Sequence, residues 1–161
     1  MKRTFLFLVY PVIACVMYGC AQMKNKEQNG EIDKLINSNS FVFHANNANP
    51  QRGGGFPLTS AYELEVIKDS LNAFLPYFGR AFTAPTKPSE GGLKSSTTDF
   101  EKEQKKSKRG WVITFYPKNQ ASATQMILDI SDNGYGNLSV ISNNREPISF
   151  YGNITALEEK D

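Results

Sequence analysis

The stretch from Tyr62 to Ala81 constrains the fold most, because its apolar and polar residues alternate. It reads YELEVIKDSLNAFLPYFGRA, with alternation up to Val66 and again from Leu71 to Leu75. A period of two is typical of a strand with one buried face. A turn at Lys68 to Ser70 joins the two strands, and Pro76, which has no N–H to donate to a ladder, ends the second. The pattern predicts a β-hairpin around which the rest of the domain is built. The residues expected on its buried face are Tyr62, Leu64, Val66, Leu71, Ala73 and Leu75.

Short segments with strand character continue along the chain and are separated by turn residues. Trp111 to Tyr116 and Thr124 to Ile130 are the strongest, because apolar residues take every second position in each. Asn133-Gly134 favours a tight turn, and no strand–helix–strand pattern is seen. We therefore expect eight or nine strands in an antiparallel sheet that is closed or strongly curled on itself. The weaker segments are Phe41–Phe43, Gly91–Leu93, Thr97–Lys105, Leu138–Ser142 and Ile148–Thr155.

Two further segments depart from the strand pattern. Glu27 to Asn39 carries Ile32, Leu35 and Ile36 at helical spacing, which predicts one short amphipathic helix before the sheet. Asn46 to Thr59 is rich in Asn, Gly and Pro. We interpret it as a long mobile loop rather than a phosphate-binding loop, because no Lys-Ser/Thr pair follows its glycines.

The N-terminus has the features of a bacterial lipoprotein signal. Lys2 and Arg3 precede an apolar run from Phe5 to Val16, which is shorter than the ~20 residues needed to span a bilayer. The run is followed by Met17-Tyr18-Gly19-Cys20, and a small residue directly before Cys resembles a lipobox. We expect cleavage before Cys20 and acylation of this residue by chains such as palmitate. Ordinary secretion and an uncleaved anchor are the alternatives.

This interpretation divides the chain into three parts. Residues 1–19 form the signal peptide, residues 20–30 carry the acylated Cys20 and a polar tether, and residues 31–161 form a single domain. Two or more acyl chains give stable anchoring, where one would be marginal. No acidic run follows Cys20, so we expect an outer-membrane protein that faces the periplasm rather than the cell surface.

The composition argues against several classes of function. Two of the 18 basic side chains leave with the signal peptide, so the mature chain has 16 basic and 16 acidic side chains, and we expect no nucleic-acid binding. Cys15 also leaves and Cys20 is acylated, so no thiol remains for catalysis or a metal site. His44 is the only histidine and has no partner motif, which favours a structural role. We expect no cofactor, no metal and no enzymatic activity.

One short motif suggests a modification. Asp69-Ser70-Leu71 resembles the acceptor used for O-glycosylation of exported Bacteroidetes proteins, and it falls at the predicted turn of the hairpin. Ser70 is therefore a candidate O-glycosylation site, provided that the protein comes from such an organism.

Several longer motifs resemble those of one protein family. Asp69 precedes Leu75-Pro76-Tyr77-Phe78-Gly79-Arg80-Ala81, and the similar stretches span roughly Asn39 to Ile154. The chain resembles an uncharacterised family of Bacteroidetes lipoproteins, the domain of unknown function 4251 (DUF4251). The resemblance implies an envelope lipoprotein with a lipocalin-like small β-barrel of about eight strands, and it implies no known activity or catalytic residue. The other stretches are Phe41-Val42-Phe43, Asn49-Pro50, Gly91-Gly92, Asp132-Asn133-Gly134, Ser142-Asn143-Asn144-Arg145 and Pro147-Ile148-Ser149-Phe150-Tyr151-Gly152.

Two of these stretches place arginine beside aromatic or amide side chains. Arginine stacks on aromatic rings and binds carboxylates or sugar hydroxyls, and the two stretches are expected to meet at one mouth of the barrel. The alternative interpretation is that the aromatic residues belong to the core and the arginines are structural. The candidate ligand-binding residues are Tyr77, Phe78, Arg80, Asn144, Arg145 and Tyr151.

The sequence therefore favours a lipid-anchored, monomeric envelope protein without catalytic activity. We expect it to contact the membrane through its anchor and to bind a small apolar or glycan-derived ligand, or to serve as a protein-interaction module. The alternative function is a hydrolase of envelope glycans or other polymers that uses paired carboxylates. A filled barrel interior would favour the interaction module over both.

Overall fold

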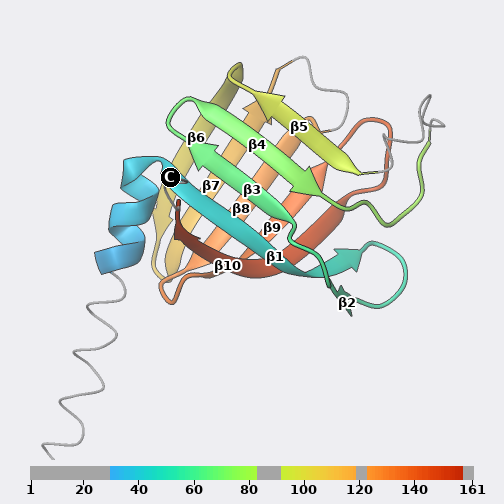
Figure 1. Ribbon diagram of the computed structural model, residues 1–161, viewed down its shortest axis with the longest axis horizontal. Coiled ribbons are helices and arrows are strands. Elements are labelled where there is room, and N and C mark those ends of the chain that lie inside the picture. Colours follow the sequence, from blue (N-terminus) through green and yellow to red (C-terminus); the bar gives the residue numbers. More distant parts are fainter. Residues whose placement is uncertain (1–29, 83–91, 119–122, 158–161) are drawn as a thin grey trace, which may run out of the picture.

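The computed structural model describes residues 30–82, 92–118 and 123–157. The predicted signal peptide, Cys20 and almost all of the tether lie outside this part of the chain. A helix occupies residues 30–38 and is followed by ten strands, drawn in Figure 1. The strands are β1 (Ser40–Pro50), β2 (Phe56–Pro57), β3 (Glu63–Ile67), β4 (Ser70–Leu75), β5 (Leu93–Thr97), β6 (Phe100–Ser107), β7 (Gly110–Pro117), β8 (Gln125–Ser131), β9 (Tyr135–Ile141) and β10 (Ile148–Ala156).

The strands form one antiparallel sheet in the order β5-β4-β3-β1-β10-β9-β8-β7-β6, with β2 paired to the end of β1. The sheet curls strongly into a half-barrel, so that β1, β3, β4 and β5 form one layer in front of β6 to β9 (Figure 1). The prediction of a mainly β, strongly curved antiparallel sheet with one short helix is confirmed. The path through the sheet has nine strands, which agrees with the eight or nine that the strand pattern predicts and is one more than the eight or so implied by the family resemblance.

The hairpin predicted from Tyr62 onward is present as β3 and β4. Ile67 pairs with Ser70, which leaves Lys68 and Asp69 as a two-residue turn. Lys68 has a φ of 50°, in the left-handed region that such tight hairpin turns use. The predicted alternation is also correct, because the residues expected inside are buried while their neighbours face outward. The exception is Tyr62, which lies before β3 and is only partly buried.

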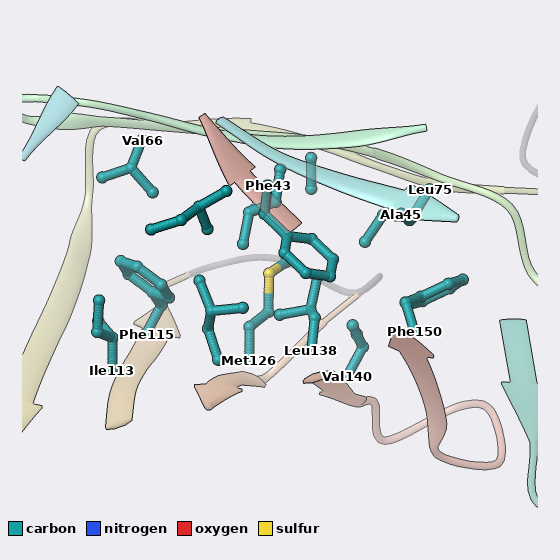
Figure 2. Packing of buried hydrophobic residues seen from close by; sticks show 14 of the residues in the cluster. Phe43, Ala45, Val66, Leu75, Ile113, Phe115, Met126, Leu138, Val140 and Phe150 are labelled. Carbon is teal, nitrogen blue, oxygen red and sulfur yellow. The ribbon is translucent and has the colours of Figure 1, made fainter. Parts of the chain in front are cut away.

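The two layers enclose a core of large apolar side chains. Figure 2 shows side chains of both layers, such as Phe43 above and Met126 and Leu138 below, meeting in the space between them. All three are fully buried. Dense packing of this kind is the main source of stability in a small domain. The largest fully buried side chains are Phe41, Phe43, Phe115, Phe150, Ile36, Leu64, Leu71, Leu75, Leu93, Ile113, Met126 and Leu128.

The helix covers the inner face of the edge strand β6, where the sheet would otherwise be open. Ile32 and Ile36 from the predicted apolar stripe join the core, and Leu35 packs against it. Phe100, at the start of β6, packs against the core. The polar residues that follow on the same face bond to residues of the helix or of the turn after it: Lys102 to Asn39, Gln104 to Asn37, and Lys106 to Asp33. Partial burial lowers the pKa of Lys102. These contacts fasten the helix to the edge strand of the sheet.

The predicted loop from Asn46 to Thr59 is wrong over its first part. β1 continues to Pro50, and its second half pairs with β10 up to Ile148. A bulge between Ala45 and Asn47 re-aims this half of the strand. Asn is uncommon in strands, so the composition of this segment did not indicate one. The segment is nevertheless a strand because its backbone pairs with β10 and β2.

Candidate functional site

The two arginine-containing stretches come together, as the sequence predicts. Ala81 forms an isolated antiparallel bridge with Arg145. The N–H of Glu146 donates to the carbonyl of Arg80 at 3.0 Å, and the N–H of Phe82 donates to the carbonyl of Asn144 at 2.8 Å. The segment after β4 is thereby fastened to the segment before β10.

Arg145 lies inside this junction with only 8% of its surface exposed. Its guanidinium carbon lies 4.8 Å from the centroid of the Tyr77 ring, and Nη1 donates to the carbonyl of Gly92 at 3.3 Å. The Tyr77 hydroxyl lies 2.8 Å from the carbonyl oxygen of Arg80 and 3.2 Å from that of Glu146. Burial raises the pKa of Tyr77. These contacts are those of a structural arginine, the alternative that the sequence left open.

The other residues predicted for ligand binding lie differently. The Arg80 side chain is exposed at the same junction. The Phe78 ring packs edge-on against Phe56, with 4.5 Å between centroids. Tyr151 stacks on Tyr135 on the outer face of β10 and β9, with centroids 6.0 Å apart. Four of the six candidates, Tyr77, Arg80, Asn144 and Arg145, therefore meet in one cluster, while the rings of Phe78 and Tyr151 pack elsewhere.

The candidate O-glycosylation site is accessible in part. Ser70 is the first residue of β4, directly after the Lys68-Asp69 turn, and its surface is partly exposed. Its outward position follows from the burial of the next residue, Leu71. Cys20, the predicted lipidation site, lies outside the described residues.

A second cluster, which the sequence did not single out, lies on the outer face of β1, β3, β4 and β5, the layer nearest the viewer in Figure 1. Register places His44 of β1 beside Glu63 of β3. His44 Nδ1 lies 3.0 Å from Glu63 Oε1, and Nε2 lies 2.8 Å from the Thr155 hydroxyl of β10. These bonds hold the imidazole at one end of the cluster.

The same face continues across β4 to β5 with a second row of hydrogen bonds. Asn72 Nδ2 donates to Glu65 Oε2 at 3.3 Å, and the Ser96 hydroxyl donates to Asn72 Oδ1 at 2.7 Å. Because each bond joins neighbouring strands, the row fixes the carboxylate of Glu65 in position.

An exposed aromatic ring stands beside this row. Phe74 retains 48% of its surface exposed. It stacks on Tyr62 with 5.7 Å between centroids, and Lys94 Nζ lies 5.0 Å from its ring centroid. A half-exposed aromatic ring beside polar groups offers a ligand an apolar contact surface next to hydrogen-bonding partners.

Two hollows flank the carboxylates of Glu63 and Glu65. One has a volume of about 470 Å³ and is bounded on the other side by β4 and β5. The other has about 220 Å³ and is bounded by β1 and the end of β10. We call the two together the outer groove. Its outward-facing lining residues are Val42, His44, Glu63, Glu65, Asn72, Phe74, Lys94, Ser96 and Thr155.

The groove offers hydrogen-bond acceptors, one ammonium donor and an apolar ring. Across the described ranges, no three His, Cys, Asp or Glu side chains are grouped so as to hold a metal ion. The described part of the chain also contains no helix that is long and apolar enough to cross a membrane. The acceptors, the ammonium group and the ring of the groove are suited to non-covalent contacts with a small polar molecule.

The sequence contained one signal for this groove. Alternation in the hairpin places Glu63, Glu65, Asn72 and Phe74 on the outer face. It did not reveal that His44 and Lys94 would join them, because these residues come from strands whose pairing the sequence does not specify.

Comparisons with known proteins agree with the fold. A search of curated proteins found no significant match. The chain is similar to the crystal structure of a DUF4251 family protein from Bacteroides eggerthii DSM 20697, with a TM-score of 0.57 and 15% identity over 83% of this chain and 90% of the other. The family model described as domain of unknown function (DUF4251) matches residues 23–154. Because this match covers most of the sequence, the chain belongs to the DUF4251 family.

Proposed function

We propose that this protein is a lipid-anchored component of the cell envelope that binds a small polar ligand without catalysis, and that the outer groove is its binding site. The observation that carries the proposal is the contrast between the groove and the interior. The space between the two layers holds large apolar side chains in contact (Figure 2). A filled interior was expected to favour a protein-interaction module, and it does argue against a ligand between the layers. The outer groove, which the sequence did not single out, offers polar groups beside a half-exposed ring instead, and it supports ligand binding on the outer face.

The anchoring part of the proposal is supported by the sequence around Cys20. An apolar segment precedes this residue, and Gly19 directly before it suits a lipoprotein peptidase. Acylation would tether the domain to the outer membrane on the periplasmic side. Labelled palmitate should enter the wild-type protein and not the Cys20→Ser variant; equal labelling of both would contradict acylation at this residue.

The binding part is tested by native mass spectrometry of the protein purified from its own host in mild detergent. We expect a retained adduct in the wild type that is lost in Glu65→Gln and Phe74→Ala. Tyr135→Ala is the matched control, because Tyr135 is an aromatic residue with 46% exposure on the same sheet but outside the groove. An adduct that survives both groove substitutions would place binding elsewhere, as would one that is lost with Arg80→Ala.

A second candidate function is the hydrolysis of an envelope glycan or other polymer. It is favoured by one observation, that Glu63 and Glu65 both border the two hollows. Paired carboxylates are the usual acid and base of glycoside hydrolysis. Release of reducing ends from envelope polymers by the wild type, and its loss in both Glu63→Gln and Glu65→Gln, would favour this function over simple binding.

A further inference from the structure

We infer that the ligand of the outer groove is a neutral or amine-bearing saccharide. This inference rests on the proposed function, because it names the chemical class of the molecule that the groove binds. It is drawn from the apolar wall, the hydrogen-bonding groups, the charge and the shape of the groove.

The apolar wall is supplied by Phe74. Tyr62 stacks against the ring at 5.7 Å and Lys94 Nζ lies 5.0 Å from its centroid, so both neighbours limit its rotation. Its remaining exposure of 48% is directed away from the core, on the outer face of β4. A pyranose ring has apolar C–H groups together with a rim of hydroxyls, and an exposed aromatic side chain among polar groups matches both properties.

The hydrogen-bonding groups are arranged for hydroxyls. Glu65 is oriented by the amide of Asn72 at its Oε2 atom, and Glu63 by His44 at its Oε1 atom. A carboxylate has room for several donors on its two oxygens, so each retains acceptor capacity for a ligand hydroxyl. Lys94 adds a donor on the opposite side of the hollow. Charge-assisted bonds of this kind are the strong class of hydrogen bond.

Charge then separates the classes of saccharide. The larger hollow is bordered by two carboxylates, Glu63 and Glu65, and by one ammonium group, that of Lys94. The field is therefore negative near neutral pH, which disfavours phosphates, sulfates and uronic acids and tolerates hydroxyl or ammonium groups.

Shape argues against an apolar lipid. A hollow of about 470 Å³ is within the range of small-molecule sites. Its floor is formed by the sheet at Ala73 and Ser95, and its walls combine the Phe74 ring and the aliphatic parts of longer side chains with polar groups from three strands, in a hollow that is open to solvent. An acyl chain needs an enclosed apolar channel to bury its methylene groups, whereas a sugar unit is satisfied by an open site with polar groups beside an apolar ring.

The test is an array of defined oligosaccharides that end in neutral hexoses, in glucosamine or in uronic acids. The probe is the full-length protein extracted from its host. We expect binding to neutral or glucosamine-ended glycans and none to uronic acids. Glu65→Gln and Phe74→Ala should each raise the dissociation constant about tenfold or more. This is the loss of affinity expected when a charge-assisted hydrogen bond or an aromatic contact is removed. Tyr135→Ala should leave the dissociation constant unchanged.

The possible failures are distinguishable. Binding only to uronic acids, binding to no saccharide, or saccharide binding that both groove variants retain would overturn the inference. If native mass spectrometry gives an adduct that depends on Glu65 and Phe74 but has the mass of a peptide or of another polar molecule that is not a saccharide, the saccharide class is wrong and the proposed function stands. An adduct with the mass of a lipid would overturn both the saccharide class and the polar ligand of the proposed function. An adduct that is independent of both residues overturns the proposed function as well.

Discussion

Neighbouring residues of strands β3 and β4 point to opposite faces of the sheet and have different roles there. On the inner face, Leu64 and Leu71 lie in the core with no more than 1% of their surface exposed. On the outer face, Glu65 and Asn72 form a hydrogen bond beside a hollow. The difference shows that one hairpin supplies both the support of the fold and the chemistry of the groove. Substitutions on the two faces should therefore affect different properties.

The largest expected effect is on stability, from the inner face. Leu64→Ala removes a fully buried side chain from the core and should lower the free energy of unfolding by about 2–5 kcal/mol. The comparison variant on the outer face is Ser96→Ala, which removes an exposed hydroxyl. It should change the free energy of unfolding by about 0.5 kcal/mol or less. Urea unfolding followed by circular dichroism measures both. Equal losses would contradict the division between the faces.

The next comparison separates the two arginines that the sequence treated alike. Arg145→Ala should cost about 1–3 kcal/mol, because it removes a buried stacking contact with Tyr77 and leaves the carbonyl of Gly92 with one donor fewer. Arg80→Ala should cost about 0.5 kcal/mol or less, since the side chain is exposed. Thermal unfolding of the two variants should rank them in this order, and the reverse order would show that Arg80 is the structural residue.

The helix contact with β6 gives a pH-dependent effect. Hydrogen bonds from Lys106 and then from Trp111 lower the pKa of Asp33 below its ordinary value of about 3.9. The ionised form is thus favoured by folding, so its contribution is complete above pH ~3.9 and is lost as pH falls through the lower folded pKa. Asp33→Asn should be less stable than the wild type at pH 7, and urea midpoints should converge as the pH falls below ~3.9. A constant difference across that range would mean that Asp33 acts through packing alone.

The smallest effect concerns a buried polar residue on the inner face of β5. Ser95 is 8% exposed, and its hydroxyl has no hydrogen-bond partner among the residues that the structure describes. A buried unsatisfied hydroxyl is unfavourable, so Ser95→Ala should leave stability unchanged or raise it by up to about 1 kcal/mol. A clear loss in chemical denaturation would indicate that the hydroxyl is bonded.

The fold was largely predictable because a strand with one buried face has apolar residues at every second position of its sequence. Residues from Leu64 to Leu75 in β3 and β4, and from Trp111 to Ile130 in β7 and β8, follow this rule closely. The second half of β1 did not, because its Asn-rich segment is held as a strand by backbone partners from β10. Local residue patterns do not indicate which strands pair when those strands are distant in the sequence.

The candidate site was less predictable for the same reason. The meeting of Arg80 with Arg145 followed from the expected barrel, but the burial of Arg145 on Tyr77 depends on the path of both segments. The outer groove needs partners such as His44 and Thr155, which lie 111 positions apart. Only the assembled sheet brings them together.

The central claim, that the ligand lies on the outer face and not between the two layers, is tested most directly by NMR. Methyl-labelled Met126, Leu138 and Val140 report on the interior, and the backbone amides of Glu65, Phe74 and Lys94 report on the groove. The ligand released from the native protein is titrated against both sets of signals. The account predicts shifts of the groove amides with the methyl signals unchanged; large methyl shifts with unchanged groove amides would contradict it.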